Sequence, residues 1–285
     1  MKVAFVINPV SGRGRQKGIE KLIPKYFTDY TVSFTEKSGD ATRLAIKAIA
    51  EEAEMVVAVG GDGTLNDCVK ALVNTGCVLA VIPCGSGNGF ANHIKMSKNL
   101  DEALDQIVNS QTHRVDTGNV NGHIFINISG VGFDAYLSQQ FNELTERGVA
   151  NYIRLVINEL NYTPKSYTMQ IDGVDRQVVA YMITCCNGTQ FGSDARICPV
   201  ADISDGVLDF VIVKNFPQVQ IPEFILRLMS GTLKNCELVE VVRAESVQII
   251  SDNPIIHLDG EPQITENPIH FSVQPKSINV AIPIS

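Results

Sequence analysis

The sequence predicts an α/β domain over residues 1–115 followed by an all-β sandwich domain over residues 116–285, with a C-terminal tail able to return to the first domain. In the first part, short Val-rich runs alternate with segments whose apolar residues recur at helical spacing, which is typical of a parallel sheet covered by helices. In the second part, many short apolar runs follow one another, separated by turn dipeptides such as Asn121-Gly122. This succession indicates antiparallel strands.

Composition and charge narrow the functional class. The chain has 285 residues, of which 45% are apolar and 19% charged, a balance that supports a sizeable core. The formal net charge of −8 argues against a nucleic-acid partner, because phosphate neutralisation needs clustered Lys and Arg. A locally positive pocket for ATP is still compatible with this charge.

Several features predict a cytoplasmic protein. The apolar start of the chain is too short for a signal peptide, and no apolar run approaches the roughly 20 residues that cross a bilayer. Any membrane contact would therefore be peripheral, at the inner face. The seven cysteines are odd in number and lack a CxxC motif, which favours reduced, buried thiols. The sequence is compatible with a dimer without fixing the oligomeric state.

The first βα unit ends in a polar, flexible turn. A strand over residues 2–7 leads into the letters NPVSGRGR at residues 8–15, and a helix is predicted over residues 18–27. The turn has neither the GxGxxG spacing nor the G-K-[ST] of a P-loop. Its polar atoms could hold an adenine nucleotide. A second strand over residues 30–35 precedes the next helix.

The central βα unit places an acid inside a glycine turn. The apolar run 55–59 leads into the letters GGDGT at residues 60–64, after which Leu65 and Val69 fall at helical spacing. Glycines let backbone N–H groups approach a phosphate, and a helix start adds further donors. The acid, Asp62, suggests that a cation joins this turn to an anion, as in a metal–nucleotide site. The alternative is an ordinary turn capped by Asp62.

The third βα unit repeats the pattern. A strand over residues 78–82 runs into PCGSGNGFA at residues 83–91, and a helix over residues 100–109 closes this half. Three units that each end in a polar, Gly-containing turn place those turns at one edge of a parallel sheet, where ligands bind in open α/β folds. The repetition predicts a nucleotide site.

Acidic residues in the second half of the chain are candidates for metal binding or proton transfer. Asp259 and Glu261 flank a glycine in HLDGE, and such a pair could bind a metal or accept a proton, although solvated acids in a hairpin turn have the same pattern. In DISDGVLD at residues 202–209, Asp205 and backbone carbonyls could bind a hard cation, or the loop could be an ordinary turn. Amphipathic segments at 147–162 and 221–233 could border a lipid pocket, touch a membrane or simply pack on the core.

Taken in order, these motifs resemble the diacylglycerol kinase catalytic family, which includes bacterial diacylglycerol kinases, related lipid kinases and sphingosine kinases. The motifs are NP-SG, GGDGTLND, PCGSGNGFA, DTGNVNG, DISDGVLD and LDGE. The resemblance spans nearly the whole chain. It implies a three-layer α/β nucleotide-binding domain of the NAD kinase and diacylglycerol kinase type with a β-sandwich lipid-substrate domain. It also implies ATP- and Mg²⁺-dependent transfer of the γ-phosphoryl group to the hydroxyl of diacylglycerol or a related lipid.

The resemblance also implies residue roles. Asp62 would organise Mg²⁺ and phosphates with Asp116 and Asp259 nearby, and either Glu261 or Asp259 would accept the substrate proton. A second Mg²⁺ would bind the side chain of Asp205 with the carbonyls of Asp202 and Val207. The nucleotide would contact Asn8, Pro9, Ser11, Gly12, Thr35, Gly60, Gly61, Asp62, Gly63, Thr64, Asn66, Gly85, Ser86 and Asn88.

One departure keeps alternatives open. Bacterial diacylglycerol kinases tend to carry Asp after the Asn of the third glycine turn, whereas Gly89 stands here, as in the sphingosine-kinase form. A sphingosine or long-chain-base kinase is therefore an alternative. NAD kinase and 6-phosphofructokinase share a GGDG turn, but PCGSGNGFA and LDGE argue against both. A non-catalytic lipid- or nucleotide-binding regulator is the remaining alternative, and the motif acids argue against it.

Overall fold

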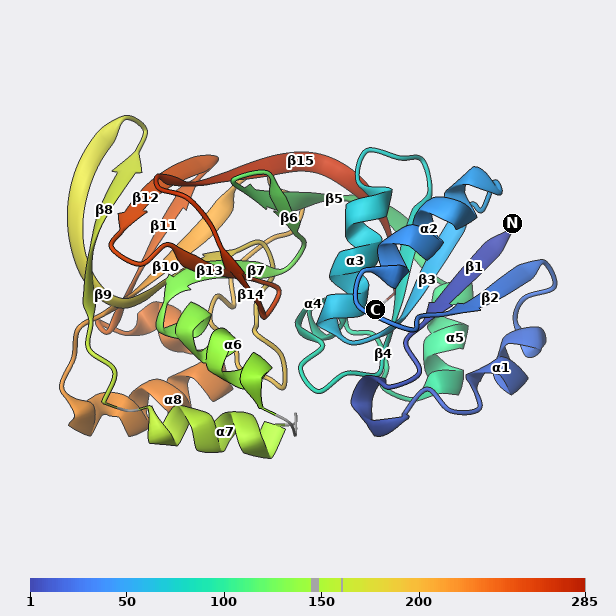
Figure 1. The fold of residues 1–285 in the computed structure, drawn as a ribbon, viewed down its shortest axis with the longest axis horizontal. Helices are drawn as coiled ribbons and strands as arrows, with labels where there is room; N and C mark the ends of the chain where they lie inside the picture. Colours follow the sequence, from blue (N-terminus) through green and yellow to red (C-terminus); the bar gives the residue numbers. More distant parts are fainter. Residues whose placement is uncertain (145–148, 160, 285) are drawn as a thin grey trace. The chain divides into compact units, whose positions relative to one another are not determined.

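The computed structural model describes residues 1–144, 149–159 and 161–284. The chain divides into two compact units, coloured by sequence in Figure 1. The first unit contains Met1–Val115 and Lys276–Ser285, and the second contains Asp116–Pro275. The first unit is thus built from two separate stretches of sequence, and the long strand β15 (Ile269–Ile282) leads from the second unit into the C-terminal stretch.

The sheet of the first unit is parallel. Its strands run in the order β2-β1-β3-β4, and the end of β15 pairs in parallel with β4 through Asn279 and Val280. Every residue of β1 and β3 is buried, as expected when helices cover both faces of a sheet. The strands are β1 (Val3–Ile7), β2 (Tyr30–Phe34), β3 (Met55–Gly60), β4 (Val78–Pro83) and β15 (Ile269–Ile282).

The right-handed crossovers between parallel strands determine which face of this sheet each helix covers. The connection from β1 to β2 runs opposite to those from β2 to β3 and from β3 to β4, so α1 lies on one face and α2 and α3 on the other. The predicted helix over 18–27 is shorter in the structure, because Pro24 has no N–H to continue it. The helices are α1 (Ile19–Leu22), α2 (Asp40–Ala50), α3 (Asp62–Leu72), α4 (Gly89–His93) and α5 (Leu100–Val108), with 3₁₀ turns at Ser11–Arg13 and Ile23–Lys25.

The second unit is organised around β9 (Val174–Cys186). Its first half pairs with β8, while its second half pairs with β7 on one side and β10 on the other, all antiparallel. The predicted fold class, an α/β domain followed by a β-sandwich, is confirmed. The other strands are β5 (Gln111–Val120), β6 (His123–Phe125), β7 (Ile128–Gly132), β8 (Lys165–Ile171), β10 (Leu208–Lys214), β11 (Val239–Ala244), β12 (Ser246–Ser251), β13 (Ile255–Leu258) and β14 (Glu261–Ile264).

Large apolar side chains fill the space between these strands. Phe210 and Phe271 stack edge-to-face, with ring centroids 5.8 Å apart, in one buried cluster. A second cluster, around Val211 and Leu233, receives Phe224 and Leu228 of helix α8 (Ile221–Ser230). These clusters join the strands into one packed body, so that the turns between strands are held in place.

Helices in the second unit differ from the prediction at several points. The sequence did not predict α6 (Phe133–Glu143), and α8 (Ile221–Ser230) ends early because Gly231 takes a left-handed conformation, φ 70°. The segment predicted over 147–162 forms α7 (Val149–Asn158), and residues 145–148 and 160 lie outside the described residues. Short 3₁₀ turns lie at Gln218–Gln220 and Leu233–Asn235.

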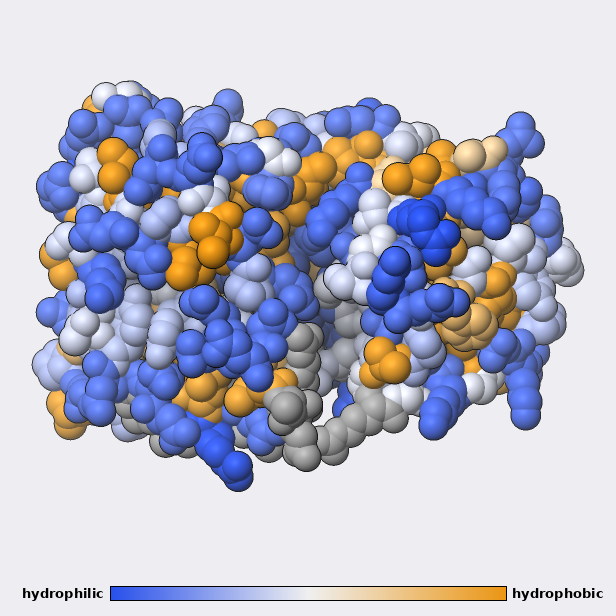
Figure 2. All heavy atoms as spheres, in the orientation of Figure 1, coloured by the Kyte–Doolittle hydropathy of each residue, from blue (hydrophilic) through white to orange (hydrophobic). Residues whose placement is uncertain are grey.

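No helix among the described residues is both long and apolar enough to cross a bilayer. Hydrophilic residues dominate the face of the molecule shown in Figure 2, with hydrophobic residues in small groups between them. All seven cysteines are free and buried, which suits the thiols predicted from the sequence.

Candidate functional site

The turns of the first unit gather at one edge of its sheet. Because β1 to β4 run in parallel, the turns that follow their carboxyl ends lie at the same edge. The predicted nucleotide-binding residues lie in or just after these turns, at 8–12, 35, 60–66 and 85–88. The structure therefore brings this predicted set together.

The glycine turns touch one another through their backbones. A Cβ on Gly85 would lie 2.5 Å from the Cα of Gly61, and a Cβ on Gly12, at φ 54°, would overlap the carbonyl oxygen of Cys84. Real Cβ atoms do not approach other atoms so closely. These glycines are therefore needed for the packing of the turns themselves, in addition to any ligand.

Asp62 fastens the second turn to the third. Its Oδ2 accepts from the N–H of Asn88, and its Oδ1 from the N–H of Gly89, each at 2.8 Å. Asn88 in turn bonds Gly85 in both directions, accepting from the N–H at 2.9 Å and donating to the carbonyl at 2.8 Å. A carboxylate has about four lone-pair sites, so these bonds are compatible with a cation on the same side chain.

The remaining predicted nucleotide residues differ in their exposure. Asn8 donates to Thr64 Oγ1 at 3.2 Å and, through Oδ1, accepts from Val10, which shapes the first turn. Thr35, Thr64, Asn66 and Asn88 are buried, whereas Pro9 and Ser86 are exposed. The buried members support the turns, and the exposed ones lie where a ligand could reach them.

In the second unit, Asp259 holds a tight hairpin. It lies between β13 and β14, with φ values of 50° and 90° at Asp259 and Gly260, as in a two-residue type I′ turn. Its Oδ1 accepts from the N–H groups of Asn127 at 2.9 Å and Ile128 at 3.0 Å, and its Oδ2 from that of Ile126 at 3.1 Å. This carboxylate thus fixes the hairpin to the start of β7. Glu261 is exposed and begins β14.

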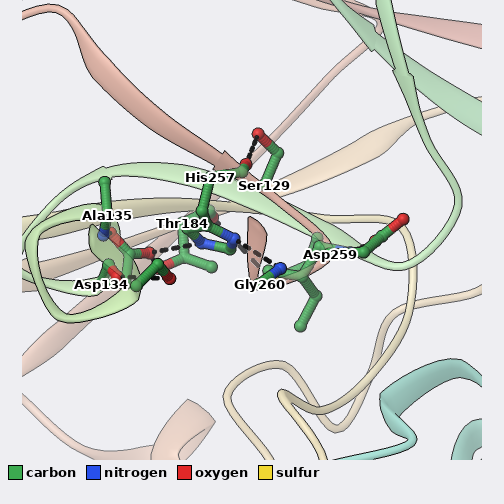
Figure 3. Close-up of polar contacts among 10 residues, drawn as sticks. Ser129, Asp134, Ala135, Thr184, His257, Asp259 and Gly260 are labelled. Atoms are coloured by element: carbon green, nitrogen blue, oxygen red, sulfur yellow. Dashed lines mark hydrogen bonds and ion pairs between the residues drawn. The ribbon is translucent and has the colours of Figure 1, made fainter. Parts of the chain in front are cut away.

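A buried polar group beneath this hairpin was not predicted from the sequence (Figure 3). His257 lies between Asp134 and Gly260, with Nε2 3.3 Å from Asp134 Oδ2 and Nδ1 3.3 Å from the N–H of Gly260. Asp134 also accepts from Thr184 Oγ1 at 2.7 Å and from the N–H of Ala135 at 2.8 Å. The one local signal was the position of His257 on β13, two residues before the turn residue Asp259.

Asp116 and the loop 202–209 form a separate cluster in this unit. Asp116 is completely buried, and its Oδ2 accepts from the N–H of Gly206 at 2.7 Å. Asp205 forms an ion pair with Arg243 of β11, which also approaches Asp209 at 3.4 Å. Burial raises the pKa of Asp209, an effect that Arg243 opposes and Asp205 increases. The positive group beside Asp205, the predicted ligand of a second Mg²⁺, is therefore the guanidinium of Arg243.

The structure thus distributes the predicted catalytic residues over both units. Asp62 belongs to the first unit, whereas Asp116, Asp259 and Glu261 belong to the second. Within the second unit, Asn187 links the surroundings of two of these acids. Its side chain donates both to the carbonyl of Asp116 and to that of Ile126, the residue whose N–H binds Asp259.

Comparison with known proteins identifies relatives across the whole chain. Residues 2–120 match the model of the diacylglycerol kinase catalytic domain, and residues 127–282 match that of the YegS C-terminal NAD kinase beta sandwich-like domain. A probable lipid kinase YegS-like of Chromohalobacter salexigens is 28% identical over 260 residues, covering 88% of this chain and 83% of the relative. A diacylglycerol kinase of Bacillus subtilis is 27% identical over 283 residues, covering 92% and 90%.

A solved structure shows the same fold. The crystal structure of a diacylglycerol kinase from Bacillus anthracis superposes with a TM-score of 0.77 at 22% identity, covering 99% of this chain and 97% of that one. At this identity the likeness concerns the arrangement of the elements.

Proposed function

This chain belongs to the diacylglycerol kinase catalytic family, with a YegS-type C-terminal domain, and from that premise we propose that it transfers the γ-phosphoryl group of ATP to a lipid hydroxyl with the help of Mg²⁺. Diacylglycerol is the proposed acceptor. The observation that supports the proposal most directly is the edge of glycine turns locked together by Asp62, Asn88 and Gly89.

The nucleotide would bind at this edge. The N-terminus of α3 begins at the GGDG turn, where N–H groups that lack partners within the helix point outward. Gly61 and Gly85 carry no side chains that would keep a phosphate away from the backbone. Asn8, Ser11 and Ser86 would contribute polar contacts around the nucleotide.

The donor set suits a Mg²⁺ ion that arrives with ATP. Among the described residues, no group of three or more His, Cys, Asp or Glu could hold a metal by itself. Mg²⁺ is usually bound by one or two carboxylates together with substrate phosphates, and Asp62 offers such a carboxylate. When bound, the ion would offset the negative charge on the transferred phosphoryl group.

Glu261 is the better proposed base of the two acids in LDGE. The oxygens of Asp259 already accept from backbone N–H groups of Ile126, Asn127 and Ile128, which suits it to hold the hairpin. Glu261 is exposed, at the first position of β14. Glu261 would accept the proton of the lipid hydroxyl, and Asp259 and the buried Asp116 would support its surroundings.

The second metal site fits less well. Asp205 already pairs with Arg243, and Asp202 Oδ1 accepts from the backbone and the hydroxyl of Ser204. A divalent ion held by Asp205 and the carbonyls of Asp202 and Val207 would have to displace Arg243. The proposed mechanism therefore has no step at this loop.

A lipid panel with labelled ATP tests the proposal. Wild-type protein should phosphorylate diacylglycerol in a Mg²⁺-dependent reaction, and sphingosine belongs in the same panel because Gly89 gives the third turn a sphingosine-kinase form. Glu261→Gln should lower kcat by about 10²–10⁴-fold, as expected for loss of a general base, with little change in ATP affinity. Asp62→Asn should lower kcat by about 10²-fold or more.

Controls separate these effects from loss of fold. Glu245→Gln removes an exposed acid of the same unit and should leave kcat unchanged. Circular dichroism should show that each variant is folded. The proposal is wrong if the wild-type protein transfers phosphate from ATP to none of the lipids in the panel. It is also wrong if a folded Asp62→Asn variant retains normal turnover.

A further inference from the structure

The buried polar group beneath the LDGE hairpin contains an acid, Asp134, and the fold must offset the cost of burying its carboxylate. Asp134 and His257 expose 5% and 2% of their surfaces. A buried carboxylate is costly unless it is well hydrogen-bonded. Ala135, Thr184 and His257 all provide donors to Asp134, and Gly130 makes room for it, because a Cβ there would lie 2.5 Å from Asp134 Oδ2.

The imidazole of His257 does more than donate a hydrogen bond to this acid. Nδ1 accepts the N–H of Gly260, so this nitrogen has no hydrogen and the ring proton lies on Nε2, where it is directed at Asp134. The ring therefore links α6, through Asp134, to Gly260, the second residue of the two-residue turn that precedes Glu261. Ser129 of the neighbouring strand donates to the carbonyl of His257 at 2.5 Å and further restrains it.

From this geometry we infer that His257 and Asp134 are positioning residues, which orient the Asp259–Gly260 turn and thereby the carboxylate of Glu261 toward the acceptor hydroxyl. The expected effect of these residues on turnover rests on the proposed function. The hydrogen bond between His257 and the Gly260 amide does not, because it is a property of the fold alone. Asp259 anchors the turn from one side through backbone N–H groups of 126–128, and His257 anchors it from the other through Gly260.

Two substitutions divide the functions of the imidazole. The side-chain oxygen of His257→Asn can take the place of Nδ1 and keep an acceptor for the Gly260 N–H. The terminal amide of His257→Gln can take the place of Nε2 and keep a donor for Asp134. A role in stability alone predicts similar behaviour for both variants, whereas positioning predicts that only His257→Gln releases the turn.

The experiment measures amide hydrogen exchange at Gly260 by NMR, together with kcat and KM for ATP and lipid. In His257→Gln, exchange at Gly260 should accelerate about tenfold, as expected for the loss of one hydrogen bond, and kcat should fall by about 10–100-fold. KM for ATP should remain within about twofold, because the nucleotide is assigned to the first unit. His257→Asn should stay close to wild type in exchange and in kcat.

Ser251→Ala serves as the matched control, since it removes a buried hydroxyl of the second unit that bonds Asn253. The inference is overturned if His257→Asn and His257→Gln change Gly260 exchange equally, or if Ser251→Ala lowers kcat as much as His257→Gln. Failure of the lipid kinase proposal would appear differently, as a wild-type protein without lipid phosphorylation, and the exchange comparison would still decide the coupling.

Discussion

Gly85→Ala tests whether the glycine turns are packed against each other as closely as the structure indicates. The new Cβ would lie 2.5 Å from Gly61 Cα and 2.8 Å from Asn88 Oδ1. Carbon atoms in contact normally lie about 3.5–4.0 Å apart, so the second and third turns would have to separate by about 1 Å. The φ of Gly85 lies outside the left-handed range, so this contact alone is responsible for the effect.

The expected size follows from this overlap. Overpacking of this kind costs about 1–3 kcal/mol, and each kcal/mol lowers Tm by about 2–4 °C in a protein of this size class, so Tm should fall by roughly 2–12 °C. Displaced N–H groups should also weaken ATP binding by roughly tenfold or more. Differential scanning fluorimetry and calorimetric ATP titration measure the two effects.

Gly76→Ala is the matched control. Gly76 follows α3 in the same unit, its φ is also outside the left-handed range, and a Cβ there would meet nothing within 4 Å. Such a change should stabilise the protein by about 0.4–1 kcal/mol, by restricting the unfolded chain, and leave ATP affinity unchanged. If Gly85→Ala melts as high as Gly76→Ala and binds ATP like wild type, the packing argument is refuted.

Two further predictions concern the loop 202–209. Arg243→Gln removes the cation beside Asp205 and Asp209, so added Mg²⁺ should raise the Tm of this variant more than that of wild type; an equal response would show that Arg243 does not compete with metal. Burial raises the pKa of Asp209, so its contribution to stability is greatest at acidic pH and is lost as the pH rises through that pKa. Asp209→Asn should therefore raise Tm at neutral pH, with the gain shrinking as the pH approaches 3.8, the ordinary pKa of an aspartate side chain; a gain independent of pH would contradict this reasoning.

Local patterns were sufficient for the fold class. The Val-rich runs that became β1, β3 and β4 are buried on both faces, and this is the property that makes parallel strands visible in a sequence. The helix α6 was missed because Phe133 follows a strand directly, without a polar linker, so its first residues read as more strand. The shortened ends of α1 and α8 depend on Pro24 and Gly231, which the periodicity of apolar residues does not register.

The candidate site depended on contacts of two kinds. Glycine turns after parallel strands are local features, so the nucleotide edge could be predicted from the order of strand, turn and helix. The bond between His257 and Asp134 joins residues 123 positions apart, and that between Arg243 and Asp205 joins residues 38 apart. Pairings over such separations leave no mark in a single sequence. The sequence could therefore propose Asp259 and Asp205 as functional acids, but not the partners that engage them.

The long strand β15 has a consequence for how the protein is made. A ribosome delivers the chain from its N-terminus, and residues 1–115 emerge well before residues 276–284, which supply the strand beside β4. Throughout synthesis of the second unit, β4 is an open edge able to pair with other chains. A fragment ending at residue 115 keeps that edge permanently, so expression of the nucleotide half alone should give an aggregation-prone product unless the terminal segment is fused back to it.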